Sequence, residues 1–455
     1  MDALLAFNSW LNGIVWGPPF LFLLVGTGVY LSIRIGFFQF THLGHAWRHT
    51  FGKVFKKDKT DEGDGAITSF QAVSSAMAAT IGVGNIAGVA TAIAIGGPGA
   101  VFWMWLSAIF GMATKFGEAV FGVRYRNVNP DGSFSGGVMQ YIENGLGKSW
   151  KWLGLLYAGF AGLAALGIGN MVQSNTVAVS LGEFGLPPLA TGIIIAVLVG
   201  LVTLGGIKRI ALTAEKIVPT MAVFYFIGSI IIIILNIGAV PGAFRDIFYY
   251  AFNPHAGIGG GAGIAVATTI RFGIARGVFS NEAGLGAASI VHAQARNHPV
   301  RQGMWGIWEV FIDTIIVCSM TSLVILTTGV IETGTTGAEL TTLAFNTGLP
   351  GPGGYIVLIA IVFFAYTTML TWNFYGEKSW EYLFGPKIVV PYRILFLIFL
   401  VIGAVGGLEF IWDIADTLNG LMAAPNLIAL IVLGGLLGRE SKNYLKEFRE
   451  KGSVR

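Results

Sequence analysis

A hydrophobic run long enough to cross a bilayer is interrupted near its middle by residues that disfavour a helix. The interruption reads Thr80-Ile81-Gly82-Val83-Gly84-Asn85, and each glycine in a helix interior costs about 1 kcal/mol relative to alanine. A helix that breaks inside a membrane exposes backbone N–H and C=O groups, which are tolerated only where protein or a cavity surrounds them. In secondary transporters such groups hold the substrate and the coupling ion. The stretch therefore predicts a binding site, unless its glycines serve only close helix packing.

The composition is that of a polytopic, all-α membrane protein. Of the 455 residues, 54% are hydrophobic and 11% are charged, whereas soluble domains carry about 25% charged residues. The single cysteine, Cys318, excludes an internal disulfide and a multi-cysteine metal site. No basic segment precedes the first apolar residues, so we expect no cleavable signal peptide.

Runs of about 20 apolar residues predict eleven transmembrane helices. We expect them at 14–35, 66–95, 98–123, 150–183, 187–205, 209–237, 260–290, 301–329, 353–376, 390–406 and 408–437. Two shorter segments, 240–252 and 339–349, are interpreted as interfacial helices.

The basic residues define an orientation. With eleven spans, nearly all of them fall on one side of the membrane, in the loops around Arg48, Arg124, Lys208, Arg301 and Lys387 and in the tail from Arg439 to Arg455. The positive-inside rule makes this side cytoplasmic, so we expect an extracellular N-terminus and a cytoplasmic C-terminus in the cell membrane. The net charge of +4 then reflects topology, and we expect membrane lipid as a partner but neither nucleic acid nor an obligate protein.

An internal repeat accompanies the break. Asn85-Ile86-Ala87-Gly88-Val89 recurs as Asn281-Glu282-Ala283-Gly284-Leu285, and the eleven spans make the two copies cross in opposite senses, as in an inverted repeat. We divide the chain into an extra helix with its loop (1–65), a first five-helix repeat (66–237), an extracellular connector (238–259), an inverted second repeat (260–437) and a basic tail (438–455). The first helix of each repeat is expected to be discontinuous.

The run Gly96-Gly97-Pro98-Gly99-Ala100-Val101-Phe102-Trp103-Met104-Trp105-Leu106 resembles the fingerprint of the alanine or glycine:cation symporter family. The likeness extends to SFQAVSSAMAATIGVGNIAGVA before it and to GVFSNEAGLGAA in the second half. The resemblance implies a LeuT-type five-plus-five fold and symport of small neutral amino acids, alanine or glycine, with Na⁺ or H⁺. It implies neither a chemical reaction nor a cofactor besides the coupling ion.

The first break is also similar to that of neurotransmitter:sodium symporters, which read roughly V-G-L-G-N there. By that match the backbone N–H groups from Thr80 to Gly84 meet the substrate carboxylate, and the carbonyls of Ala78 and Ile81 bind sodium. Thr367 and Thr368 complete the sodium site, and Thr371 is the reserve because the alignment slips there by one residue. Ile86-Ala87-Gly88 stands where the relatives have an arginine gate, so the gate stays unassigned.

Other candidate site residues follow from the chemistry of a zwitterion. Its ammonium needs acceptors, for which we predict unwound carbonyls at Gly277-Val278-Phe279-Ser280. Phe279, Met369 and Trp372 are predicted to form the wall around a small side chain. Asn170 and Gln173, three residues apart on one helix face, either contact the substrate or join helices.

Charged residues inside spans are costly and need partners. Lys115 and Glu118 are expected to pair with each other or to reach the interface. Arg276 and Glu282, beside the second break, are interpreted as gate residues or internal ion pairs. For Asp313 both a coupling-proton role and a pairing role stay open.

The alternative function is an ion or small-solute channel. Two non-identical breaks in one chain favour a single central site over a pore built from several subunits. The sequence has no HExxH, GxSxG or GxxxxGK[ST] motif, so it favours neither an enzyme nor an ATP-driven pump.

Overall fold

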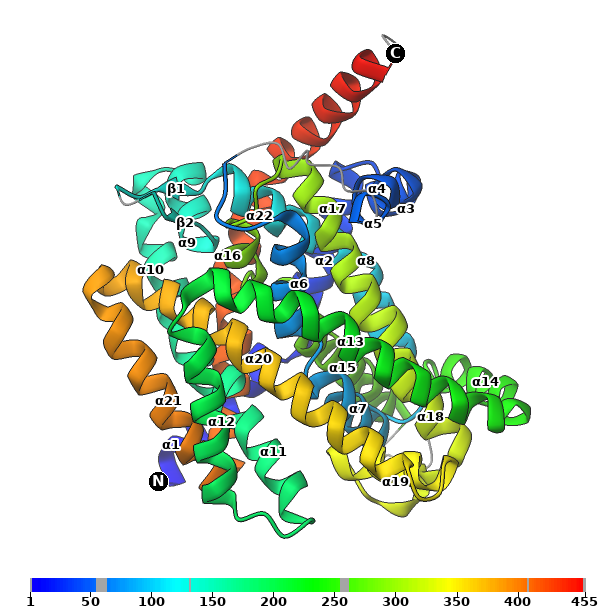
Figure 1. The fold of residues 1–455 in the computed structure, drawn as a ribbon. Helices are drawn as coiled ribbons and strands as arrows, with labels where there is room; N and C mark the ends of the chain where they lie inside the picture. Colours follow the sequence, from blue (N-terminus) through cyan, green and yellow to red (C-terminus); the bar gives the residue numbers. More distant parts are fainter. Residues whose placement is uncertain (1, 55–63, 131, 254–261, 407–408, 453–455) are drawn as a thin grey trace.

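The computed structural model describes residues 2–54, 64–130, 132–253, 262–406 and 409–452. Helices make up nearly all of this chain (Figure 1). The strands within these ranges are β1 (Asn127–Val128) and β2 (Phe134–Ser135), which pair antiparallel with Val128 opposite Phe134.

Eight helical stretches within the described ranges are long and apolar enough to cross a membrane. They are α1 (Asp2–Val15) with α2 (Pro18–Arg34), α8 (Ala100–Arg124), α10 (Lys151–Leu166) with α11 (Val172–Gly182), α13 (Gly206–Leu235), α17 (Pro299–Val310) with α18 (Ser319–Thr328), α20 (Gly353–Phe384), α21 (Val389–Val405) and α22 (Glu409–Gly452). The paired stretches α10–α11 and α17–α18 are joined by π-helical segments, Gly167–Met171 and Phe311–Cys318.

The bent pair α6 (Ser69–Thr80) and α7 (Val89–Gly96) raises the number of spans to nine. Two further predicted spans correspond to the shorter helix α12 (Pro188–Thr203) and to α15 (Ala262–Asn281) followed by α16 (Ala288–His292). The count of eleven, the five-plus-five repeat and the five-part division of the chain therefore stay predictions.

The remaining helices are short and lie between the spans. They are α3 (Phe38–Thr41), α4 (Leu43–His49), α5 (Phe51–Val54), α9 (Val138–Tyr141), α14 (Val240–Tyr250) and α19 (Gly337–Gly348), with single turns at Ile142–Leu146, Ile237–Ala239 and Val330–Thr333. Three further turns, Gly84–Gly88, Lys148–Trp150 and Pro386–Ile388, belong to the spans themselves. The helices α14 and α19 match the two segments predicted to be interfacial, and the last part of the predicted connector, 254–259, lies outside the described residues.

Local sequence explains where several helices begin. Thr68 and Gln71 form a capping box at the start of α6, since Thr68 Oγ1 accepts from Gln71 N and Thr68 N donates to Gln71 Oε1. Pro18, Pro188 and Pro299 stand in the first turn of α2, α12 and α17, where a missing N–H costs nothing.

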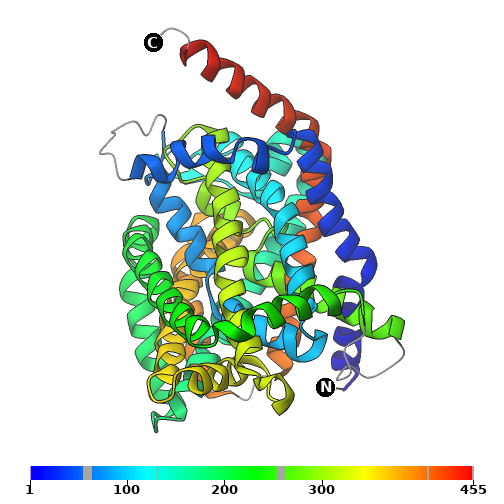
Figure 2. The same ribbon diagram turned by 90° about the vertical axis from the view of Figure 1, so that its right-hand side faces the viewer.

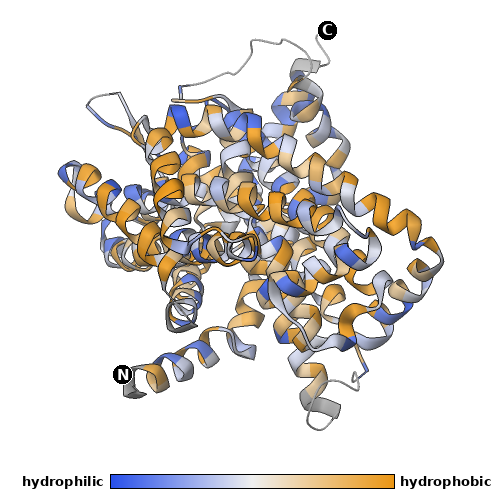
Figure 3. Ribbon diagram, turned by 60° about the horizontal axis from the view of Figure 1, so that its bottom comes forward, coloured by the Kyte–Doolittle hydropathy of each residue, from blue (hydrophilic) through white to orange (hydrophobic). Residues whose placement is uncertain are grey.

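The helices divide into a buried core and a lipid-facing periphery. In α8, 83% of the most apolar stretch is buried inside the protein, but the corresponding share in α21 is 28%. α8 packs against α15 and α17, and Gly306 allows the close approach to α17, since a Cβ there would lie 2.8 Å from Lys115 O. Apolar residues predominate along the outer helices (Figure 3).

The two ends of the chain lie on opposite faces of the molecule. Figures 1 and 2 both place α1 at one end and the last turns of α22 at the other. The pair β1–β2 and α9 lie at the same end as the last part of α22 (Figure 1).

Candidate substrate and cation site

The first helix break lies where the sequence predicts it. α6 ends at Thr80, Ile81 adopts φ −76° and ψ 85°, and the helix that follows is bent by 49° from α6. Asn85 closes the break, because its Oδ1 accepts a hydrogen bond from Gly82 N at 2.8 Å. Thr80 and Asn85 are both buried. The prediction of a discontinuous helix at 80–85 is confirmed.

Two of the N–H groups predicted to meet a carboxylate are already used. Ile81 N donates to Met77 O at 2.8 Å, and Gly82 N donates to Asn85. The helix resumes at Val83 and Gly84, and the first N–H groups of a helix lack intrahelical acceptors. These two groups, with the positive end of the helix dipole, are therefore the better candidates for binding an anion.

Asp313 connects the first break to the end of α15. Its Oδ1 accepts hydrogen bonds from Asn85 Nδ2 at 2.7 Å and from Ser280 Oγ at 3.2 Å, and its Oδ2 accepts from Thr314 Oγ1 at 2.8 Å. Asp313 is fully buried and forms no ion pair with any described residue. A buried carboxylate without a cation is costly, so this position favours either a bound cation or a proton.

The residues predicted for sodium are only partly brought together. Thr368 Oγ1 lies 3.1 Å from Ala78 O, and a Cβ at Gly82 would lie 2.7 Å from that hydroxyl, so Thr368 faces the break. Thr367 does not: its hydroxyl donates to carbonyls of its own helix and contacts Met221 Sδ of α13 at 3.6 Å. The reserve residue Thr371 instead faces α6.

The helical period explains why Thr371, and not Thr367, lies on the same face of α20 as Thr368. Residues three apart share a helix face, whereas adjacent residues point about 100° apart. Thr371 Oγ1 accordingly donates to Ser75 O at 2.9 Å, one turn along α6 from the contact of Thr368. Ile81, the other predicted carbonyl ligand, is buried at the end of α6.

The second helix break lies later than predicted. α15 continues through Asn281, whose Oδ1 accepts from Ala283 N at 2.9 Å. The turn that follows contains three residues in the left-handed region, Glu282 (φ 56°), Gly284 (φ 99°) and Gly286 (φ 81°). Glycine tolerates this conformation and glutamate rarely adopts it, so Glu282 is held there by its surroundings.

Gly277, Val278, Phe279 and Ser280 are therefore helical, and the prediction that they are unwound is wrong. Gly277 serves close packing instead, because a Cβ there would lie 2.8 Å from Ser107 Oγ of α8. The carbonyl of Val278 accepts from Glu282 N at 2.8 Å. The side chain of Phe279 nevertheless reaches the first break, where its Cδ1 would lie 3.1 Å from a Cβ on Gly84.

Trp372 connects α20 to the second break. Its Nε1 donates to Glu282 Oε1 at 2.9 Å, and the indole is buried. Its ring lies directly over Gly169, since a Cβ added at that glycine would overlap Trp372 Cβ and Cγ. Met369, one turn earlier, is also buried. The predicted role of Phe279, Met369 and Trp372 as a wall around the substrate stays a prediction.

The two intramembrane amides behave differently. Asn170 Nδ2 donates to Phe396 O at 2.7 Å and so joins α21 to the π-helical segment, as interhelical contacts do. Gln173 Nε2 donates to Ile168 O of its own helical stretch at 3.0 Å, and its Oε1 has no partner among the described residues. Asn170 Oδ1 likewise has no partner among the described residues, so both predicted substrate contacts keep a free acceptor.

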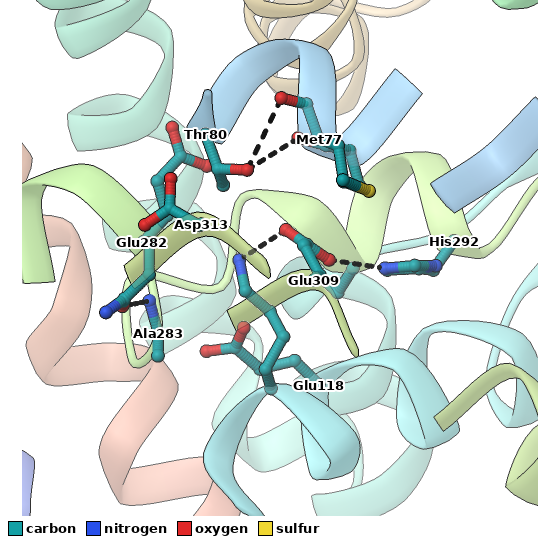
Figure 4. A network of polar contacts seen from close by, with 12 residues as sticks. Met77, Thr80, Glu118, Glu282, Ala283, His292, Glu309 and Asp313 are labelled. Atoms are coloured by element: carbon teal, nitrogen blue, oxygen red, sulfur yellow. Dashed lines mark hydrogen bonds and ion pairs between the residues drawn. The ribbon is translucent and has the colours of Figure 1, made fainter. Parts of the chain in front are cut away.

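A chain of polar contacts fills the core beside the second break (Figure 4). Lys115 Nζ lies 3.0 Å from Glu309 Oε1, His292 Nε2 lies 3.0 Å from Glu309 Oε2, and Gln302 Nε2 lies 2.7 Å from His292 Nδ1. Lys115, Glu309 and His292 have no exposed surface. This network ties α8, α16 and α17 together, and Lys115 does not pair with Glu118 as one prediction had it.

Glu118 holds the second break from the other side. Its Oε1 accepts hydrogen bonds from Gly284 N at 2.9 Å, from Gly286 N at 3.1 Å and from Asn426 Nδ2 at 2.7 Å. Tyr141 donates in turn to Asn426 Oδ1. The two glycine N–H groups freed by the break are thus satisfied by a buried carboxylate of α8.

Arg276 was predicted to be either a gate residue or part of an internal ion pair. It lies 3.6 Å from Asp416 of α22, so it forms an internal ion pair.

Sequence reasoning missed Asn373, which is fully buried and whose Nδ2 and Oδ1 both lack a partner among the described residues. The sequence feature that would have identified Asn373 is its amide side chain, which directly follows Trp372 in an apolar span.

A family model described as the sodium:alanine symporter family matches residues 1–454. The chain is 48% identical over 452 residues to a sodium/alanine symporter, AgcS, of Methanococcus maripaludis, covering 98% of both chains. It is 37% identical over 447 residues to the putative sodium/proton-dependent alanine carrier protein YrbD of Bacillus subtilis, covering 94% of this chain and 90% of that one.

Among solved structures, the chain is similar to MhsT in complex with L-phenylalanine. The TM-score is 0.58 at 13% identity, and the match covers 83% of this chain and 98% of MhsT. At that identity the likeness concerns the fold, which is of the LeuT type as the sequence predicts.

Proposed function

Because the chain belongs to the sodium:alanine symporter family, we propose that it couples the inward movement of Na⁺ to the uptake of a small neutral amino acid, alanine or glycine. No covalent chemistry is involved, and the only cofactor is the coupling ion. The protein is a multi-pass membrane protein, and by its basic loops its N-terminus is extracellular and its C-terminus cytoplasmic in the cell membrane.

The observation that carries this proposal is the buried carboxylate of Asp313 between the two broken helices. Sodium is a hard cation that prefers oxygen ligands. Asp313 supplies two carboxylate oxygens, and the hydroxyl oxygens of Ser280 and Thr314 lie beside them at 3.2 and 2.8 Å. A cation at this position neutralises a charge that is otherwise unpaired in a low-dielectric environment.

A second set of oxygens lies at the first break on its α20 side. The hydroxyl of Thr368 and the carbonyl of Ala78 are 3.1 Å apart, and Thr371 with the carbonyl of Ser75 follows one turn away. Two positions rich in hydroxyl and carbonyl oxygens support coupling to sodium, whereas Asp313 alone would also suit a proton.

The amino acid is proposed to bind between these positions. Its carboxylate meets the N–H groups of Val83 and Gly84 at the start of the second half-helix, and the free oxygens of Gln173 and Glu282 are acceptors for its ammonium. Phe279 and Trp372 limit its side chain. Glu282 Oε2 and Gln173 Oε1 are acceptors without a partner among the described residues, and an ammonium brings the donors that they lack.

The proposal is tested by uptake of radiolabelled alanine into liposomes that contain the purified protein. Uptake is measured with an inward sodium gradient and, separately, with a proton gradient, for the wild type, Asp313→Asn and Thr368→Ala. Sodium-dependent accumulation that both variants abolish supports the function and both ion positions. If protons alone drive accumulation and Asp313→Asn abolishes it, the coupling ion is the proton and not sodium. Passive equilibration without accumulation under either gradient refutes symport and favours a channel.

A further inference from the structure

A polar pocket lies well away from the central site, between the β1–β2 hairpin, α9 and the last turns of α20. Its volume is about 220 Å³, and the elements β1–β2 and α9 that contribute to its lining lie at the end of the molecule where the last part of α22 lies (Figure 1). In the proposed orientation this is the cytoplasmic face. The described residues in its walls carry amide, hydroxyl, ammonium and carboxylate groups, and among them only Pro386 has an aliphatic side chain.

One wall of the pocket contains a buried acceptor without a donor. Gln140 in α9 is 6% exposed, and its Oε1 has no hydrogen-bond partner among the described residues. A buried amide oxygen left unpaired costs about 1–3 kcal/mol, so it favours a ligand that brings an N–H donor.

The opposite wall carries one charge of each sign. Lys378 Nζ lies 2.7 Å from Glu381 Oε2, and both side chains are largely buried, at 13% and 17% exposure. An ammonium has three donors and a carboxylate about four acceptor positions, so this single contact leaves both groups able to bind further partners. Two opposite charges side by side complement a ligand that itself has a carboxylate next to an ammonium.

The frame around these groups is held by its own hydrogen bonds. Asn129 Nδ2 donates to Ser133 Oγ at 2.9 Å and to Ser135 Oγ at 3.0 Å, and Tyr382 OH donates to Glu143 Oε2 at 2.8 Å. These bonds hold the lining of the pocket in place without a ligand. The Gln140 oxygen has almost no accessible surface, so a ligand satisfies it only when the amide turns toward the pocket.

We propose that this pocket binds a small amino-acid zwitterion from the cytoplasm, with Lys378 meeting its carboxylate and Glu381 and the Gln140 oxygen meeting its ammonium. The choice of alanine or glycine as ligand rests on the proposed function. α20 carries both this pocket and Thr368, with ten residues or about 15 Å of helix between Thr368 and Lys378. Binding here would let the accumulated product act on the helix that also contributes to the ion site.

The test uses a cysteine reporter in the purified full-length protein. The native Cys318 is buried, so wild type gives the background of labelling by a membrane-impermeant maleimide. Ser135→Cys places a thiol in the pocket, and Ser133→Cys, on the same hairpin but outside the pocket lining, is the matched control. Labelling rates are measured with and without alanine, in potassium buffer without sodium so that the central site is not loaded.

Alanine is expected to slow the labelling of Ser135→Cys and not that of Ser133→Cys. Acetate and ethylamine, each with one of the two charges, should protect far less. Adding Gln140→Leu or Lys378→Met should raise the alanine concentration needed for protection about tenfold or more, as loss of a hydrogen bond to a charged group does. Both variants should retain sodium-driven uptake into vesicles without internal alanine, which shows that they fold.

Two results would overturn the inference. If alanine does not protect Ser135→Cys, it does not bind in this pocket and the inference is wrong. The proposed function is unaffected by that result, because the uptake assay tests it separately. Protection that needs sodium, disappears with Asp313→Asn and survives Gln140→Leu would originate at the central site, which supports the proposed function and refutes the second site.

Discussion

The ion pair between Lys115 and Glu309 allows a prediction about stability that can be worked from the structure. The two groups lie 3.0 Å apart with no exposed surface, on α8 and α17, which pack tightly at Gly306. Lys115→Met removes the ammonium and leaves the Glu309 carboxylate with His292 alone. Removing one partner of a buried pair costs about 3–5 kcal/mol, because the remaining charge stays desolvated. We expect that loss in the free energy of unfolding.

The double variant Lys115→Met, Glu309→Met separates this cause from a simple loss of packing. With both charges removed, an apolar pair of similar volume is often neutral, and His292 loses one hydrogen bond worth about 1 kcal/mol. The double variant should therefore be more stable than either single variant, with a coupling energy of about 2 kcal/mol or more.

Denaturant titration in detergent micelles, followed by circular dichroism, measures these differences through the unfolding midpoint. Lys446→Met is the control, since Lys446 pairs with Glu450 at 3.9 Å on an exposed surface and such pairs contribute little. If Lys115→Met unfolds at the midpoint of this control, or if the double variant is the least stable of the set, the reasoning about a desolvated charge is wrong.

Three further predictions concern the central site. Gly169→Ala should destabilise the protein by about 1–3 kcal/mol and lower alanine uptake, because the added Cβ would overlap Trp372. Gly159→Ala is the control, since a Cβ there would have nothing within 4 Å, and it should change neither quantity. Equal uptake by the two variants would contradict the close contact between Gly169 and Trp372. Thr368→Val should raise the sodium concentration for half-maximal uptake about tenfold, whereas Thr367→Val should leave it unchanged; a sodium titration of uptake decides between them. Trp372→Ala should admit larger amino acids, and an unchanged range in competition assays would remove Trp372 from the wall.

The first break could be predicted because its cause is local. Two glycines and an asparagine within six residues of an apolar span weaken the helix, and the structure closes the break with the side chain of Asn85 itself. The membrane character likewise follows from composition. The family and the LeuT-type fold were predicted from resemblance to known families, which needs no knowledge of any contact.

The second break and the threonine pair depend on contacts distant in sequence. Where α15 ends is set by Glu118, 166 residues before the glycine whose N–H it accepts. Alignment to a relative cannot fix which of two adjacent threonines faces a neighbouring helix, because a slip of one residue rotates the side chain by about 100°. Thr367 therefore turned out to face α13, and Thr368 the break.

The partners of Asp313 explain how ion binding can act on the helices themselves. Its Oδ1 accepts from Asn85 of the first broken helix and from Ser280 at the end of α15, so a cation that binds this oxygen competes with the hydrogen bonds that hold the two elements together. A ligand shifts a conformational equilibrium only by its difference in affinity between the two states. A state in which Asn85 and Ser280 have moved apart exposes more of the carboxylate to the cation, and the state described here satisfies the carboxylate with protein donors. If the proposed cation binds Asp313, its binding and the separation of the two helices are linked, and by reciprocity any substrate that stabilises one arrangement changes the affinity for the cation.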